Sequence, residues 1–158
     1  MFQFIKKTES KKYNFQGKEI ELLINEKVFP ISEGSRLFAE NIRINPGEKV
    51  IDIGTGTGIL AILAAKLNGN VYATDINESS ILLAKENSKN NNVSINFKKG
   101  SYFADFNEKF DVIIANLPQE IITDKYKKEI GEKLITTISG GKLGNKYILV
   151  HSPFKSFN

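Results

Sequence analysis

The chain has 158 residues, of which 41% are hydrophobic and 25% are charged, so it suits one domain with a buried core rather than a disordered or fibrous chain. Its longest apolar run, residues 59–65, is far shorter than the roughly 20 residues of a membrane span, and the absence of cysteine excludes disulfides and predicts a reducing, cytoplasmic location. The formal net charge of +4 comes almost wholly from lysines scattered among acids, which indicates a solvated surface more than an arginine-rich nucleic-acid interface.

Residues 1–30 are expected to form a small β extension ahead of the main domain. Strands are predicted at Phe2–Ile5 and Lys18–Ile24, and Gln16–Gly17 is a turn signal between them. Lysines alternate with aromatic residues along residues 2–15, a pattern that fits an edge hairpin protected against aggregation. RNA contact by the same residues is the alternative.

The main domain, residues 31–158, changes to helical spacing from Ser32 until Asn45-Pro46-Gly47 stops the run. After Pro46, strand and helix patterns alternate, which predicts an α/β fold with a mostly parallel sheet, helices on both faces and right-handed crossovers. The chain has little length beyond the last strand pattern, so the C-terminal strands of the fold are expected to be few or truncated. The predicted strands are Val50–Ile53, Asn70–Thr74, Ser94–Phe97, Asp111–Ala115 and Lys146–Val150, and the predicted helices are Ile59–Leu67, Ser79–Asn87 and Lys125–Thr137.

A buried-type strand runs directly into the glycine-rich turn Asp-Ile-Gly-Thr-Gly-Thr-Gly at residues 52–58, which opens a helix. In a parallel sheet this turn lies at the carboxyl end of a strand, where ligands bind. Glycines allow a tight turn and the close approach of a ligand. Asp75 ends the next strand, near the roughly 20-residue offset at which a carboxylate binds ribose hydroxyls.

The glycine spacing discriminates between cofactors. A dinucleotide loop, G-x-G-x-x-G, would need a glycine where this chain has Ile59, and no G-K-[ST] of a phosphate-binding P-loop follows. Asp52 would disfavour a pyrophosphate but could accept hydrogen bonds from an ammonium group. We therefore expect a nucleoside ligand with a cationic tail, and a nicotinamide dehydrogenase is the disfavoured alternative.

The glycine turn, Asp75 and the sequence Asn116-Leu-Pro-Gln119 together resemble the class I S-adenosylmethionine-dependent methyltransferases. Within them the chain is similar to the small-domain group that holds release-factor glutamine methyltransferases and RNA base N-methyltransferases. The resemblance implies a Rossmann-like fold and S-adenosyl-L-methionine as cofactor. It places Asp52 at the methionine amino group, the backbone of Gly54 to Gly58, with Thr55 and Gly56, along the methionine part and ribose, and Asp75 at the ribose hydroxyls. Ser101 is expected beside the adenine, and Ile76 and Asn116 are expected to contact the cofactor as well.

The resemblance also implies where a methyl acceptor would lie. Asn116 and the carbonyl of Leu117 could accept the N–H bonds of a planar nitrogen and orient its lone pair, while Pro118 restricts Leu117 to extended conformations. Phe29 and Gln119 would lie at the substrate. A strand-ending turn is the structural alternative for these residues.

The predicted function is therefore S-adenosylmethionine-dependent N-methyl transfer to a protein glutamine amide or a nucleic-acid base amino group. The family usually has Asn-Pro-Pro and an aromatic where this chain has Leu117 and Gln119. A cofactor-binding module without catalysis, or a truncated methyltransferase, is thus the alternative. The expected partner is a protein or RNA acceptor, without a membrane, and no metal is expected because the chain has one histidine, His151, and no cysteine.

Overall fold

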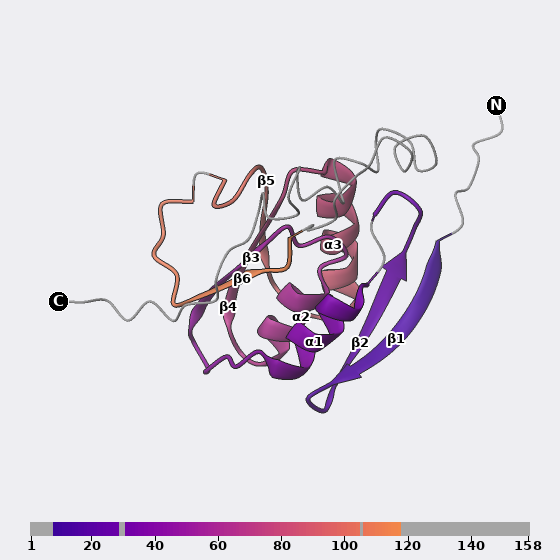
Figure 1. Cartoon of the computed structure of the whole chain (residues 1–158), viewed down its shortest axis with the longest axis horizontal. Helices are drawn as coiled ribbons and strands as arrows, with labels where there is room; N and C mark the ends of the chain where they lie inside the picture. Colours follow the sequence, from indigo (N-terminus) through magenta and orange to yellow (C-terminus); the bar gives the residue numbers. More distant parts are fainter. Residues whose placement is uncertain (1–7, 29–30, 105, 118–158) are drawn as a thin grey trace.

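The structure is a computed structural model that describes residues 8–28, 31–104 and 106–117 (Figure 1). In chain order its elements are β1 (Glu9–Phe15), β2 (Lys18–Ile24), α1 (Glu33–Asn41), β3 (Lys49–Ile53), α2 (Ile59–Lys66), β4 (Asn70–Asp75), α3 (Glu78–Asn90), β5 (Asn96–Lys99) and β6 (Val112–Ala115). Several predicted features lie outside the described residues, namely Phe2–Ile5, Phe29, Pro118, Gln119, Lys125–Thr137 and Lys146–Val150.

Four strands form a parallel sheet in the order β5-β4-β3-β6, and β1 pairs with β2 in a separate antiparallel hairpin. This confirms the predicted α/β class with its parallel sheet. The two crossovers from β3 to β4 and from β4 to β5 step in the same direction, so right-handedness places α2 and α3 on one face. Figure 1 shows three layers, with the helices between the sheet and the hairpin.

Helix α2 is the centre of the core. Its residues from Ile59 to Ala64 are all buried, and it contacts β2, β3, β4 and the other two helices. A helix that is apolar on every side needs cover on every side, which the sheet, the neighbouring helices and the hairpin provide. Phe15, Ile20 and Leu22 of the hairpin belong to the same buried cluster as α2. The division of the chain at residue 30 stays a prediction.

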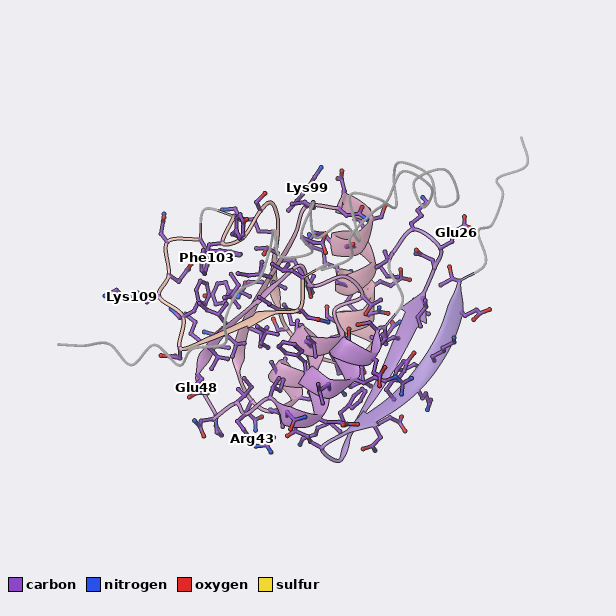
Figure 2. The ribbon with its side chains drawn as sticks, in the orientation of Figure 1. Glu26, Arg43, Glu48, Lys99, Phe103 and Lys109 are labelled. Atoms are coloured by element: carbon purple, nitrogen blue, oxygen red, sulfur yellow. The ribbon has the colours of Figure 1, made fainter. Side chains whose placement is uncertain are left out.

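The face of the sheet opposite α2 is covered, within the described residues, by aromatic side chains of the segment that follows β5. Tyr72 on β4 meets the rings of Phe106 and Phe110 edge-on, with ring centroids 5.1 and 5.3 Å apart. Phe103 stacks on Phe110 and lies on the side of the sheet away from the helices (Figure 2). The helix predicted at Lys125–Thr137 for a second face lies outside the described residues.

The hairpin contains a strand that the sequence did not predict. The partner of β2 is β1, Glu9–Phe15, because Gln16 and Gly17 form a two-residue turn with φ of 51° and 75° that pairs Phe15 with Lys18. Two positive φ values suit the tight turn of a hairpin. A hairpin of β1 and β2 is present as a two-stranded sheet of its own, and Lys12 pairs with Glu19 across the strands at 3.1 Å. That its lysines protect it against aggregation stays a prediction. Within the described residues no helix is long and apolar enough to cross a bilayer.

Gly69, at the turn between α2 and β4, provides a test of core packing. A Cβ there would lie 3.0 Å from Ile44 Cγ2, 3.1 Å from Ala64 O and 3.1 Å from Val50 Cγ2. Gly69→Ala should therefore lower the free energy of unfolding by about 1–3 kcal/mol, the usual cost of overpacking, measured by urea denaturation. The exposed neighbour Asn70, changed to alanine, is the control and should change stability far less; equal stability of both variants and the parent would contradict the packing argument.

Candidate functional site

The carboxyl ends of three adjacent strands converge at one edge of the sheet. The order β4-β3-β6 places the glycine turn that follows β3 between Asp75, which ends β4, and Asn116, which follows β6 (Figure 1). Parallel strands end at the same edge, so residues far apart in the sequence become neighbours there. The three motifs singled out in the sequence therefore share one place in the fold.

The glycine turn is held by the main chain of β4. Gly54 N and Thr55 N both donate to the carbonyl oxygen of Thr74, at 2.8 and 3.0 Å. Gly54, Gly56 and Gly58 have φ of 73°, 56° and 87°, a region that side chains with a Cβ rarely adopt. A Cβ at Gly56 would meet nothing within 4 Å, so that position is open to a ligand.

Asp75 is oriented by two backbone donors. Its Oδ2 accepts from Gly56 N at 2.9 Å and its Oδ1 accepts from Asn77 N at 2.8 Å. A side-chain hydrogen bond from Ser80 also reaches this carboxylate, and with up to about four lone-pair sites on a carboxylate it can still accept a further hydroxyl group. Burial raises the pKa of Asp75, and the hydrogen bonds from Asn77 and Gly56 partly offset this.

Asp52 is a carboxylate buried beneath the turn. It is 2% exposed, and its Oδ2 accepts from Thr55 Oγ1 at 2.7 Å. Burial raises the pKa of Asp52 to about 7, the Thr55 hydroxyl opposes this, and the negative charge of Asp75 adds to the rise. No salt bridge to Asp52 forms within the described part of the chain. The site thus has a buried acid without a counter-charge, which suits a ligand with an ammonium group.

Asn116 is held by α1, a contact that the sequence analysis did not foresee. Asn116 Nδ2 donates to Ser35 Oγ at 2.9 Å, and Ser35 Oγ lies 3.1 Å from Ser32 Oγ, the cap of α1. The amide nitrogen of Asn116 is thereby engaged. Its Oδ1, which lies beside α1 where a Cβ on Gly34 would come within 3.3 Å, accepts no hydrogen bond from the described residues. The spacing Ser32-x-x-Ser35 was a signal for a helix start, but nothing local linked it to Asn116.

Leu117 contacts the glycine turn directly. A Cβ at Gly54 would lie only 2.6 Å from Leu117 Cδ2. The side chain of Leu117 therefore covers Gly54, whereas the sequence assigned a role only to its carbonyl group. The glycine at position 54 is required both by its positive φ and by this close approach.

Two of the residues predicted at the cofactor, Ile76 and Ser101, follow the carboxyl ends of β4 and β5. Ile76 is 50% exposed and Ser101 is exposed. The segment that carries Ser101 is fastened to β4, because Gly100 N donates to Asp75 O at 2.9 Å and Thr74 Oγ1 donates to Tyr102 O at 2.5 Å. Phe29, Pro118 and Gln119 lie outside the described residues. Roles for all of these residues stay predictions.

Comparisons of the chain with known proteins show which family it belongs to. The family model of ribosomal protein L11 methyltransferase (PrmA) matches residues 36–143. The chain is 37% identical over 119 residues to a ribosomal protein L11 methyltransferase of Dictyoglomus thermophilum, covering 73% of this chain and 39% of that protein. It is 38% identical over 97 residues to a release factor glutamine methyltransferase of Streptococcus pneumoniae, covering 60% of this chain and 33% of that protein.

A solved structure agrees in fold. The tRNA (uracil-54, C5)-methyltransferase of Pyrococcus abyssi, in complex with S-adenosyl-L-homocysteine, superposes with a TM-score of 0.58 at 26% identity, over 76% of this chain and 31% of that one. The chain thus spans well under half the length of these relatives.

Asp52 makes stability depend on pH in a defined direction. The pKa of Asp52 is about 7 in the folded chain and near 3.8 in the unfolded chain. As pH rises, the unfolded chain therefore loses its proton first. The folded state loses stability between about pH 4 and pH 7, by up to about 1.4 kcal/mol per pH unit. Asp52→Asn removes this loss. We expect the melting temperature of the variant, relative to the parent, to rise between pH 5 and pH 8; a difference that stays constant with pH would contradict the burial argument.

Proposed function

Because this chain belongs to the family of ribosomal protein L11 methyltransferases, we propose that it binds S-adenosylmethionine at the glycine turn and methylates a planar nitrogen of a protein. The observation that carries the proposal is the amide of Asn116, whose nitrogen is held by Ser35 and whose oxygen faces no donor of the described residues. A fixed acceptor beside a cofactor turn suits the orientation of an N–H group. A cytoplasmic location belongs to the same proposal.

The residues at the edge of the sheet fit the cofactor. Asp52 is a buried carboxylate that a methionine ammonium group would neutralise, and Asp75, held by Gly56, Asn77 and Ser80, keeps acceptor capacity for a ribose hydroxyl. Gly56 leaves open space where other residues have a Cβ. When bound, the cofactor supplies a methyl group on a positively charged sulfur, which is the electrophile of the reaction.

Asn116 and Leu117 bind and orient the nitrogen that accepts the methyl group. The lone pair of an amide nitrogen is delocalised, so its attack depends on orientation. Asn116 Oδ1 and the Leu117 carbonyl accept the two N–H groups and direct the lone pair toward the methyl group. The C–N bond would form as the bond between the methyl carbon and the sulfur breaks, and the nitrogen would then release its proton to water. No general base of unusual pKa is therefore needed.

The relatives favour a protein acceptor over RNA. Two of them carry the names of a ribosomal protein methyltransferase and a release factor glutamine methyltransferase. The tRNA methyltransferase, whose named target atom is the carbon C5 of a uracil, makes RNA the second candidate only as a class of acceptor. Radiolabelled S-adenosylmethionine should label purified ribosomal protein L11 or a release factor in the presence of this protein. Labelling of total RNA alone would transfer the proposal to an RNA base, and binding without any labelling would favour a module without catalysis.

Substitutions at the two acids and at Asn116 should affect different steps, cofactor binding and methyl transfer. Asp75→Ala should weaken S-adenosylmethionine binding at least about tenfold, since hydrogen bonds to a charged group contribute about 1.5–3 kcal/mol, and Asp52→Ala should weaken it as well. Asn116→Ala should leave the affinity within about twofold and lower turnover. Isothermal titration calorimetry tests this, with Glu86→Ala on the exposed side of α3 as the control; equal affinities of all variants would refute the assignment.

Ser35 should act on turnover through Asn116. In Ser35→Ala the amide of Asn116 loses its anchor and can rotate, so we expect turnover to fall about tenfold while cofactor affinity stays unchanged. Ser35→Thr keeps the hydroxyl and is expected to restore most of the rate. Methyl transfer assays on the labelled acceptor measure both, and a loss in the threonine variant equal to that in the alanine variant would count against a positioning role.

A further inference from the structure

Two asparagines of α3 dock the hairpin onto the domain. Asn87 Oδ1 accepts from Leu23 N at 2.7 Å, and its Nδ2 donates to Leu23 O at 3.1 Å. Asn91 Oδ1 accepts from Glu21 N at 3.0 Å, and its Nδ2 donates to Glu21 O at 2.6 Å. Each side-chain amide therefore satisfies both backbone groups of one residue on the edge of β2 that β1 does not cover.

The spacing of the two amides matches the strand. Asn87 and Asn91 are four residues apart on a helix, which rises 1.5 Å per residue and so separates them by about 6 Å. Glu21 and Leu23 are two residues apart on a strand, about 6.6 Å. Residues at this interval present their N–H and C=O groups to the same edge. The two carboxamides thus take the place of a neighbouring strand.

The two asparagines differ in their remaining hydrogen bond. The second Nδ2 donor of Asn91 returns to Asn87 O of the same helix, at 2.8 Å. The second Nδ2 donor of Asn87 reaches Thr57 O in the glycine turn, at 2.9 Å. Asn87 is fully buried, with 0% exposure. Asn87 therefore forms hydrogen bonds with both the hairpin and the glycine turn.

The glycine turn rests on the same face of α3. A Cβ at Gly58 would lie 3.0 Å from the Cβ of Ala84, and Ala84 is one turn before Asn87. The Thr57 carbonyl is fixed by Asn87 on one side, while Gly56 N is fixed by Asp75 on the other. The two contacts thus fix the peptide units that join Thr55 to Gly56 and Thr57 to Gly58, and the unit between them depends on both.

We propose that Asn87 is a positioning residue for the cofactor turn, and that it couples the docking of the β1–β2 hairpin to cofactor binding. The inference rests on the proposed function, since the turn must hold S-adenosylmethionine. Because coupling between two sites is reciprocal, a bound cofactor must stabilise the docked hairpin by the same factor by which the docked hairpin favours the cofactor. Asn91 holds the hairpin but does not reach the turn.

The test compares Asn87→Ala with Asn91→Ala. Both variants lose two hydrogen bonds to β2 and should lower the melting temperature. Only Asn87→Ala should weaken the binding of S-adenosylhomocysteine, by about tenfold in calorimetry, with Asn91→Ala within about twofold of the parent. Equal affinities of the two variants would overturn the coupling. Failure of the parent to bind S-adenosylhomocysteine would instead overturn the proposed function.

A measurement on the parent protein keeps the inference testable if Asn87→Ala does not fold. Amide hydrogen exchange is followed by NMR with and without S-adenosylhomocysteine. Exchange should slow more at Leu23, which is bonded to Asn87, than at Glu21, which is bonded to Asn91. Equal slowing at the two amides would show that Asn87 transmits nothing beyond general stabilisation.

Discussion

A single carbonyl oxygen, that of Thr74, determines the path of the cofactor turn. It accepts from both Gly54 N and Thr55 N, and this shared hydrogen bonding draws the chain leaving β3 across the end of β4. The path requires positive φ at the glycines. It also brings Gly56 N within 2.9 Å of Asp75, so the loop, the carboxylate and the strand order form one arrangement that none of them produces alone.

The same arrangement gives a functional reason for Asp52, a buried acid that lowers the stability of the folded chain. Asp52 is buried beside the turn, and its ionised form is disfavoured by the loss of water and by the nearby charge of Asp75. The low dielectric that penalises the ion also strengthens its attraction to a positive ligand group. Stability in the absence of ligand and affinity for a cationic ligand therefore oppose one another at this residue.

The strands between residues 49 and 115 were predictable within two residues, because their periodicity is strong: the strand expected at Asn70–Thr74 is Asn70–Asp75, and the helix expected at Ile59–Leu67 is Ile59–Lys66. The helix expected at Ser79–Asn87 instead continues to Asn90, and the helix that begins after Ser32 ends at Asn41, before the turn signal at residues 45–47. Strand β1 was missed because its outward residues are polar and only Tyr13 and Phe15 turn inward among its exposed neighbours. In such a strand the alternation is too weak to distinguish it from a charged loop.

The sequence by itself determined the local chemistry: three alternating glycines that exclude a dinucleotide turn, two acids at the ends of adjacent strands, and an asparagine after a third. These features can be predicted from the sequence, because the backbone conformations open to a glycine and the position where a strand ends depend on residues close together in the chain. Only the tertiary structure decided that Ser35 holds Asn116 and that Asn87 joins Leu23 to Thr57. Such hydrogen bonds link residues tens of positions apart, and their geometry exists only once helices, sheet and hairpin have packed together.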